Sequence, residues 1–412
     1  MLITCSLCKK KHFYRDTCPL IYKVMKQNQF NREAKQDYFG ASPNLFVGRF
    51  GYPNINVGIL NTEHDQYQEN DNHLLWSREN YQIPQIMDLR LSLINSSFKA
   101  NIKTFDDRFL QMSQEVAMAQ NPVDVELHLS KKPQHKLSFH QEASPHGTTV
   151  RLVQANITEN PKIPTKIDKA VSDTDLKANE ALTTLYQKEI DEHYLTKLLS
   201  AGTLGLGKNR KLVPTRWSIT AVDDTLGKAL VEEIKTFPET DCTAFAGGYL
   251  GNYYIVLFFP GVWEYELFET YAEAPLAQQD QWMKPHGGQS WTTDYEPYFG
   301  RKTYAEETAG GFYAARLPVL EHLKKVKRQA SCLVLRFITR DYYAHLGVWV
   351  CREAVRKTMN TPPIVFSSKE LLIEFVGKFV KKKFNYPADV LLKASKVLQN
   401  QNQQSKLAAF GF

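Results

Sequence analysis

The chain has 412 residues, of which 43% are hydrophobic and 23% charged, and its formal net charge is +7. This composition is close to that of globular proteins and excludes a mostly disordered chain, while an aromatic content of 12% leaves rings for surfaces that stack on a ligand. No window approaches the roughly 18 uncharged apolar residues of a membrane span, and the opening MLITCSLCKKKH lacks the apolar core of a secretory signal, so we expect a cytoplasmic protein.

Charge is distributed unevenly along the chain. Residues 313–412 hold 18 Lys and Arg against 6 Asp and Glu, a net charge of +12, which leaves 33 against 38 elsewhere, a net charge of −5. Such an asymmetry predicts an anionic partner for the C-terminal part. The alternative is a solvated lysine face, which would explain Lys381, Lys382 and Lys383 equally well.

The N-terminal segment 1–39 begins with a candidate metal site. Its spacing is Cys5-x2-Cys8-x3-His12-x5-Cys18, and thiolate sulfur and imidazole nitrogen are the ligands that zinc prefers in tetrahedral sites. A unit of this size cannot bury its own core, so a metal is its natural organiser. We therefore predict a structural Zn²⁺, the alternative being a loose segment with ordinary reduced thiols.

The first half of the body mixes strands and helices. Residues 40–61 are rich in Gly, Pro and β-forming side chains, which predicts short strands joined by tight turns. Helical spacing runs over 86–119, and 123–129 alternates like a strand. A linker is expected over 130–149. The second half of the segment 159–202 predicts a long amphipathic helix, opened by Ser172 or Asp173 and closed by Gly202.

The second half begins with a short helix over 226–234 and a β-meander over 242–270, split by the turn dipeptide at Pro260. Residues 311–316 and 332–339 read as a further meander or a β–α unit, and 369–384 and 387–398 as helices. The fold class is therefore α+β. We expect three parts: an N-terminal zinc module with a helix (1–39), a compact body (40–398) and a flexible tail (399–412). The body has a possible subdivision near 130–165 and a basic part at 313–398.

The segment 202–217, GTLGLGKNRKLVPTRW, is the most basic and glycine-rich stretch of the body. Backbone N–H groups beside glycines and cationic side chains suit a phosphate, although no GK[ST] closes a P-loop here. Arg49, between the two glycines of VGRFGYP, is a candidate for the same anion, the alternative being an ion pair with an acidic neighbour. The alternative is a helix C-terminus with solvated basic residues, and Trp217 could either stack on a base or pack in the core. The candidate phosphate- or DNA-binding residues are Arg49, Lys208, Arg210, Lys211 and Arg216.

Acid–base candidates are weaker. Asp223, His286 and His345 are candidates for proton transfer, although no HExxH or GxSxG motif accompanies them and a lone histidine such as His345 is equally explained as a core residue. Glu264 and Glu266 lie two residues apart on an expected strand, so they share one face and could form a carboxylate pair. The alternative is the polar face of a half-buried strand.

The C-terminal end has the layout of a sliding-clamp-binding peptide. Gln404 is followed by Leu407 and Phe410 at intervals of three residues, and by Phe412. In a 3₁₀ turn the apolar pair lies on one side and can fill a pocket while the glutamine hydrogen-bonds beside it. An alternative is an apolar end that docks on its own domain.

The chain resembles the archaeal Nre (NreA-type) proteins over nearly its whole length. The segments that carry the resemblance are 42–58 (SPNLFVGRFGYPNINVG), 160–182 (NPKIPTKIDKAVSDTDLKANEAL), 205–224 (GLGKNRKLVPTRWSITAVDD) and 404–412 (QSKLAAFGF). The resemblance implies DNA damage repair, an N-terminal zinc module and binding of the sliding clamp PCNA. The family's module usually has four cysteines, whereas His12 is the substitute here, and the usual second aromatic is displaced from position 411 to Phe412.

Two functions follow as hypotheses. In the first, the protein is a repair factor tethered to PCNA, with a body that contacts DNA through the 205–217 loop and the basic C-terminal part. In the second, it is a nucleotide- or DNA-end-processing enzyme that holds a phosphate with the 205–217 loop.

Overall fold

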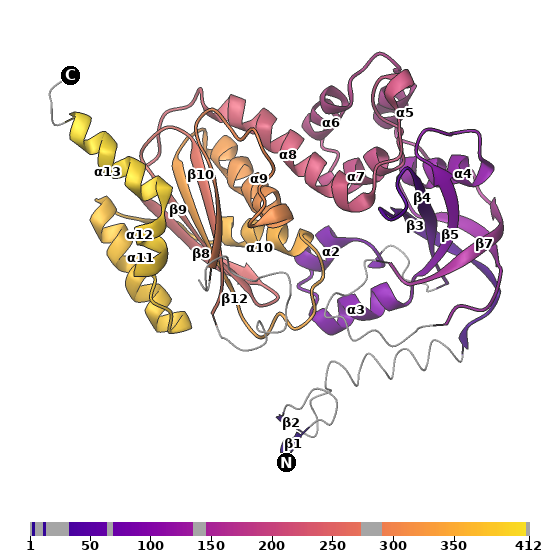
Figure 1. Ribbon diagram of the computed structural model, residues 1–412, viewed down its shortest axis with the longest axis horizontal. Coiled ribbons are helices and arrows are strands. Elements are labelled where there is room, and N and C mark those ends of the chain that lie inside the picture. The colour runs from indigo at the N-terminus through magenta and orange to yellow at the C-terminus, as the bar shows by residue number, and fades with distance from the viewer. Residues whose placement is uncertain are drawn as a thin grey trace. The chain divides into compact units, whose positions relative to one another are not determined.

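The computed structural model describes residues 33–63, 69–134, 146–272 and 291–403, and also the backbone of 2–4, 11–13 and 404–408. The chain divides into two units: unit 1 comprises Met1–Val222 and Tyr343–Gly347, and unit 2 comprises Asp223–Tyr342 and Val348–Phe412. Both units combine helices with β-structure, which confirms the α+β class (Figure 1). The subdivision expected near 130–165 would fall inside unit 1.

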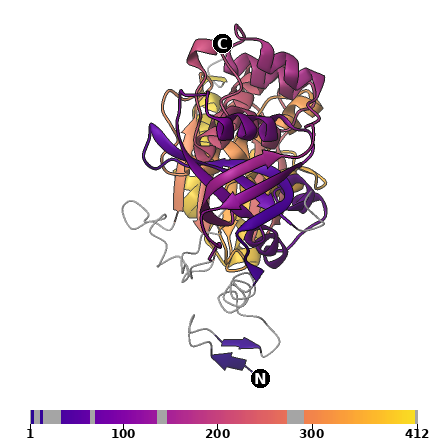
Figure 2. The same ribbon diagram turned by 90° about the vertical axis from the view of Figure 1, so that its right-hand side faces the viewer.

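Unit 1 is built on a closed five-stranded barrel. The strands are β3 (Asp37–Val47), β4 (Asn54–Thr62), β5 (Ile94–Asn101), β6 (Val123–Leu129) and β7 (Thr148–Ile157). Their order is β3-β4-β5-β7-β6, and β3 closes the barrel by pairing with β6. Only β5 and β7 pair in parallel. Figure 2 turns these strands toward the viewer.

Alternation along the strands fills the barrel interior. In β6, Val123, Val125, Leu127 and Leu129 are buried, and β4 contributes Ile55, Val57 and Ile59 to the same apolar core. Helix α4 (Arg108–Met118) lies between the third and fourth strands of the barrel in the chain and packs Leu110, Met112 and Val116 into that core. Strand order, closure and helix position are those of a five-stranded oligonucleotide/oligosaccharide-binding (OB) barrel.

The remaining helices of unit 1 are inserted into or follow the barrel. Between β4 and β5 lie α2 (His73–Arg78) and α3 (Ile83–Leu91); after β7 come α5 (Thr165–Ser172), α6 (Ala178–Gln187), α7 (Glu192–Ser200) and the 3₁₀ turn η2 (Gly207–Asn209). Helix α8 (Thr215–Ile234) begins in unit 1, and the division falls after Val222. Near the N-terminus, β1 (Leu2–Thr4) pairs antiparallel with β2 (Lys11–Phe13).

Unit 2 is a six-stranded sheet in the order β11-β10-β12-β9-β8-β13. The strands are β8 (Thr243–Tyr249), β9 (Asn252–Phe259), β10 (Glu264–Tyr271), β11 (Trp291–Glu296), β12 (Ser331–Ile338) and β13 (Ile364–Val365). The helices are α9 (Ala309–Val326), α10 (Trp349–Met359), α11 (Lys369–Phe384), α12 (Asp389–Ala394) and α13 (Lys396–Ala408). Only β10 and β12 pair in parallel.

Helices cover both faces of this sheet. Leu372, Val376 and Val380 of α11 pack on one face together with residues of α12 and α13, whereas α10 packs against β8 and β9 beside α9. Figure 1 shows the two groups, in yellow and in orange, on opposite sides of the strands. A strand covered on both faces has no solvated side, which explains the continuous apolar run of β9.

Several expected elements are confirmed, and others are wrong. The strand at 123–129 and the helix at 369–384 have the expected bounds, and the 242–270 meander forms β8, β9 and β10. The helix expected over 86–119 is interrupted by β5, because this segment forms a strand that pairs with β4 on one side and with β7 on the other. Residues 311–316 belong to α9 rather than to a strand.

The long helix expected over the second half of 159–202 is two helices, α6 and α7, and a separate helix, α5, precedes them. Asp173 ends α5 instead of opening a helix, because its carboxylate accepts hydrogen bonds from the N–H groups of Asp175 and Leu176 and forms a turn. Asp191 caps the next break by accepting from Tyr194 N. Gly202 does follow the last helix, with a φ of +68°. Residues 399–408, expected as a tail, continue α13. None of the described helices is long and apolar enough to cross a membrane.

Candidate functional site

The turn between β3 and β4 projects aromatic and basic side chains into solvent. Gly51 has a φ of +84°, and a Cβ there would lie 2.8 Å from Asn54 O, so the turn depends on glycine. Asn54 N donates to Gly51 O at 2.9 Å and closes it. Phe50 and Tyr52 are 77% and 45% exposed, and the Arg49 guanidinium lies 5.0 Å from the Phe50 ring centroid.

The N-terminal end of α8 lies beside this turn. Val47 N, at the end of β3, donates to Thr215 Oγ1 at 2.9 Å. The ring centroid of Trp217, the third residue of the helix, lies 5.6 Å from that of Tyr52, and the Trp217 side chain is 46% exposed. The structure thus leaves Trp217 on the surface instead of in the core. It also brings Arg216, one of the predicted cations, next to the turn that carries Arg49.

The outer side of β4 and β5 continues this surface. Asn54 is paired with Asn101 and Asn56 with Lys99, and Asn101 Nδ2 donates to Asn54 Oδ1 at 2.9 Å. Three backbone segments are joined at the end of these strands: Ile102 N donates to Pro53 O at 3.1 Å, and Leu212 N donates to Ile102 O at 2.8 Å. Lys103 and Lys211 flank that junction and are exposed.

We call this surface the barrel face. Its members are solvent-facing side chains from three segments, 48–57, 99–105 and 211–217, namely Arg49, Phe50, Tyr52, Asn54, Asn56, Lys99, Asn101, Lys103, Lys211, Arg216 and Trp217. The three segments contain five cationic side chains and no Asp or Glu. The barrel face is therefore positively charged and carries three aromatic rings.

Two of the predicted cations lie elsewhere. Arg210 donates from Nε to Gly205 O at 2.8 Å and from Nη2 to Val171 O at 2.7 Å, and partial burial lowers its pKa. Its guanidinium therefore holds the 202–211 loop onto the connection between α5 and α6. Lys208 is exposed in η2, on the same side, where Gly207 N donates to Thr174 O at 2.8 Å. The glycines of this loop serve close packing.

The structure describes two of the three acid–base candidates. Asp223 is fully buried and receives the Arg352 guanidinium, with Nη2 2.7 Å from each carboxylate oxygen. His345 is half-buried in the segment 343–347 of unit 1. His286 lies outside the described residues. The contacts of Asp223 are those of a structural ion pair.

Glu264 and Glu266 do share one face of β10, and both are buried. Glu264 accepts from Tyr295 Oη at 2.7 Å and from Asn400 Nδ2 at 2.8 Å. Glu266 accepts from Ser395 Oγ at 2.6 Å and from the N–H of Lys396 and of Val397. Burial raises the pKa of Glu266, although these hydrogen bonds act in the opposite direction. The pair anchors the start of α13 to the sheet.

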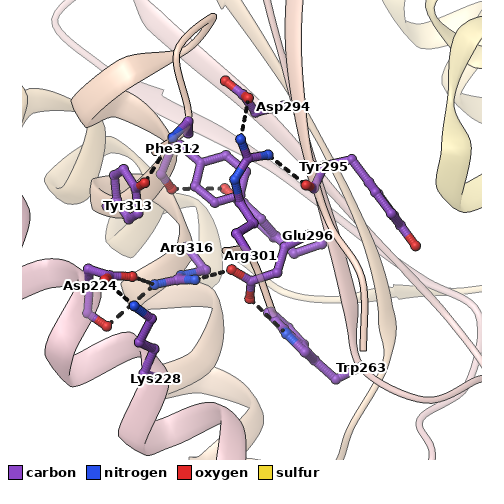
Figure 3. Close-up of polar contacts among 12 residues, drawn as sticks. Asp224, Lys228, Trp263, Asp294, Tyr295, Glu296, Arg301, Phe312, Tyr313 and Arg316 are labelled. Atoms are coloured by element: carbon purple, nitrogen blue, oxygen red, sulfur yellow. Dashed lines mark hydrogen bonds and ion pairs between the residues drawn. The ribbon is translucent and has the colours of Figure 1, made fainter. Parts of the chain in front are cut away.

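A second buried network fills unit 2 between α8, α9 and β11 (Figure 3). Arg316 Nη2 lies 2.8 Å from Asp224 Oδ1, and Nη1 donates to the Glu296 carboxylate, which also accepts from Trp263 Nε1 at 3.2 Å. Burial acts to lower the pKa of Arg316, but the two carboxylates more than offset it, so the pKa is raised. A Cβ at Gly227 would lie 2.8 Å from Arg316 Nη2, so glycine makes room for this guanidinium.

These ion pairs account for part of the positive charge that the sequence concentrates in residues 313–412. Arg316, Arg336 and Arg352 belong to the basic C-terminal part, and their carboxylate partners belong to the segment 223–296. The partner of Arg336 is Glu269. Charges that are separated along the chain are thus neighbours in space, and part of the cationic excess is neutralised inside unit 2.

Most of the residues predicted to bind zinc or the sliding clamp lie outside the part of the chain that the structure describes. Cys5, Cys8 and Cys18 lie outside the described residues, as do Phe410 and Phe412. His12 is in β2, and Gln404 and Leu407 are in α13, where the backbone alone is described. The sequence analysis did not single out Phe50, Tyr52 or the polar residues of β4 and β5. Phe50 and Tyr52 could have been found from the stretch GRFGYP, where two aromatic residues lie in a glycine-rich turn.

Comparison with known proteins identifies the family. The family models described as "Archaeal Nre, N-terminal" and "Archaeal Nre, C-terminal" match residues 8–276 and 296–410. The protein named DNA repair protein NreA from Haloferax volcanii is 39% identical to this chain, and the match covers 80% of each chain. The protein of the same name from Archaeoglobus fulgidus is 36% identical, and the match covers 92% of this chain and 95% of the relative. DNA repair protein NreB of A. fulgidus is 34% identical, covering 88% of this chain and 90% of its own.

This chain therefore belongs to the archaeal Nre family. No solved structure matches it. The two family models leave out residues 277–295, a stretch that follows β10 and includes β11 up to its last residue, whereas the structural division falls within α8.

Proposed function

We propose that this chain is a DNA repair protein that binds DNA through the barrel face and is tethered to the sliding clamp PCNA by its C-terminal end. Its relatives are named DNA repair proteins. The observation that carries the DNA contact is the barrel face itself, with five cations and no carboxylate in its three segments. Cationic side chains attract the phosphate backbone and release its counterions.

The DNA contact is tested by the salt dependence of binding. With five phosphate contacts on a single strand, affinity falls about a hundredfold between about 50 and about 200 mM salt. Arg49→Gln and Arg216→Gln should each weaken binding and reduce the steepness of log affinity against log salt by about 0.7. Fluorescence anisotropy with labelled DNA measures both quantities.

Arg78→Gln is the matched control for these variants. Arg78 is an exposed arginine of α2, outside the barrel face, and its side chain pairs only with the adjacent Glu79 among the contacts seen. It should leave affinity and salt dependence unchanged. Equal slopes for the wild-type protein, Arg49→Gln and Arg216→Gln would contradict the proposed contact.

The clamp contact is proposed on the sequence of the last nine residues. Gln404, Leu407, Phe410 and Phe412 supply one hydrogen-bonding and three apolar side chains, which suit a hydrophobic pocket. A tether of this kind raises the concentration of the protein at DNA without strong binding by either site alone.

Truncation after Gln403 should abolish PCNA binding in a calorimetric titration. The truncated chain keeps the contacts that dock α13, since Asn400 bonds to Glu264 and Gln401 to Ser331 and Pro260 O. Loss of binding is therefore attributable to the missing residues, and an unchanged melting temperature is the control. Equal binding by both chains, or binding by neither, would contradict the tether.

We also propose a structural Zn²⁺ held by Cys5, Cys8, His12 and Cys18. Three thiolates and an imidazole complete a tetrahedral site, which leaves no open position for a substrate. The donor spacing carries this proposal, and the β1–β2 pair, which brackets Cys5 and Cys8 in the chain, is consistent with it.

A further inference from the structure

Exposed aromatic side chains gather on the barrel face. Five large apolar side chains are exposed among the described residues of unit 1, and three of them, Phe50, Tyr52 and Trp217, belong to this one surface. Rings of this size are normally buried, because leaving them in water forgoes a large hydrophobic gain. A cluster of three, surrounded by cations, therefore indicates a ligand with both flat apolar faces and negative charge.

The arrangement of the rings suits stacking from outside. Tyr52 and Trp217 are tilted by 50° to each other, so neither ring lies flat on the other. Phe50 carries the Arg49 guanidinium 5.0 Å from its centroid. Such a contact restrains the ring through a cation–π interaction and places a positive charge over one of its faces.

Polar groups that can read base edges lie next to the rings. Asn54, Asn56 and Asn101 present amide groups on β4 and β5, and Lys99 lies opposite Asn56. Amides donate to and accept from the edges of bases. In a duplex the faces of the bases are stacked on one another, so aromatic rings can stack on them only in a single strand, where the pairing edges are also open to the amides.

The place of these residues in the fold agrees with this chemistry. The β3–β4 turn joins the first two strands of the barrel, and β4 and β5 are its second and third strands. In OB barrels this loop and this pair of strands form the surface that receives extended oligomers.

We infer that the barrel face binds single-stranded DNA in preference to duplex DNA, with bases stacked on Phe50, Tyr52 and Trp217 and phosphates on the surrounding cations. This inference rests on the proposed DNA binding and names the form of DNA. Affinity would come from two separable sources: the rings supply the discrimination between single strand and duplex, and the cations supply the salt-dependent part.

The test compares an oligothymidine of about twelve nucleotides with a duplex of about twelve base pairs, by anisotropy at one salt concentration. The single strand should bind at least about tenfold more tightly. Phe50→Ala and Tyr52→Ala should each weaken single-strand binding by about 5- to 150-fold and leave both duplex binding and the salt slope unchanged. Tyr52→Phe keeps the ring and should retain binding.

Two controls make the result specific. Phe39→Ala removes another exposed ring, 57% exposed on β3 and outside the barrel face, and should change nothing. Oligothymidine should quench tryptophan fluorescence in the wild-type protein, and this quenching should be lost in Trp217→Phe, which retains an aromatic ring. All these side chains are exposed, so the variants should fold, and circular dichroism checks this.

The outcomes separate this inference from the proposed function. Equal affinity for single strand and duplex, or single-strand binding that survives Phe50→Ala and Tyr52→Ala, overturns the stacking inference, while a salt slope that depends on Arg49 and Arg216 would still support DNA binding. Absence of binding to both DNA forms at low salt overturns the proposed function and the inference together.

Discussion

Replacement of Asp223 with alanine is expected to lower the free energy of unfolding by about 3–5 kcal/mol. Asp223 and Arg352 are 0% and 2% exposed, and the guanidinium makes three hydrogen bonds of 2.7–3.1 Å to the carboxylate. The variant leaves a buried positive charge without this carboxylate, and water cannot take its place at no cost. The pair also joins α8 to α10, so its loss loosens two helices of unit 2.

Urea denaturation followed by tryptophan fluorescence measures the effect. Asp389→Ala is the control, because Asp389 is an exposed carboxylate in the first turn of α12, and its removal should cost no more than about 1 kcal/mol. A loss below about 1 kcal/mol for Asp223→Ala would contradict the structural role of the pair and would return Asp223 to the acid–base candidates.

Arg316→Met is expected to cost a similar amount, about 3–5 kcal/mol, for the opposite reason. Methionine preserves length and apolar packing, but it leaves the Glu296 carboxylate, 2% exposed, with Trp263 Nε1 and without its cation. A buried negative charge is then uncompensated. The double variant Arg316→Met/Glu296→Gln removes both charges, so it should recover part of the loss.

Lys228→Met is the control within the same network. Lys228 Nζ lies 2.6 Å from Asp224 Oδ2, but its side chain is 63% exposed, so solvent screens the pair and its loss should cost less than about 1 kcal/mol. The same denaturation experiment measures all three variants. Additive losses in the double variant would show that Arg316 and Glu296 do not depend on each other and would contradict this account.

The two units differ in what their polar residues do. In unit 2, buried arginines are matched with carboxylates, which stabilises the packing between helices and sheet. On the barrel face of unit 1, Arg49 and Arg216 project from segments that contain no carboxylate. An exposed cation on a segment of this kind is a better candidate for a phosphate contact than an arginine in a buried ion pair, so the barrel face is the better candidate for DNA.

The sequence by itself determined much about this protein. The α+β class and the Nre family followed from hydrophobic spacing and from long distinctive segments such as 205–224. Elements with strong periodicity, such as β6 and α11, were predicted to the residue because their apolar positions repeat without interruption. Short elements and breaks were missed: β5 owes its conformation to β4 and β7, and Asp173 ends a helix through a local turn.

Only the tertiary structure decided which side chains are available for function. Barrel closure joins β3 to β6 across more than 80 positions of the chain, and this pairing has no local signal. Arg210 and Arg216 look alike in the sequence, yet one is bonded to backbone carbonyls and the other lies beside Trp217 on an exposed helix end. Exposure and pairing depend on which distant residues lie opposite a side chain, because burial and charge neutralisation act through space and not along the chain.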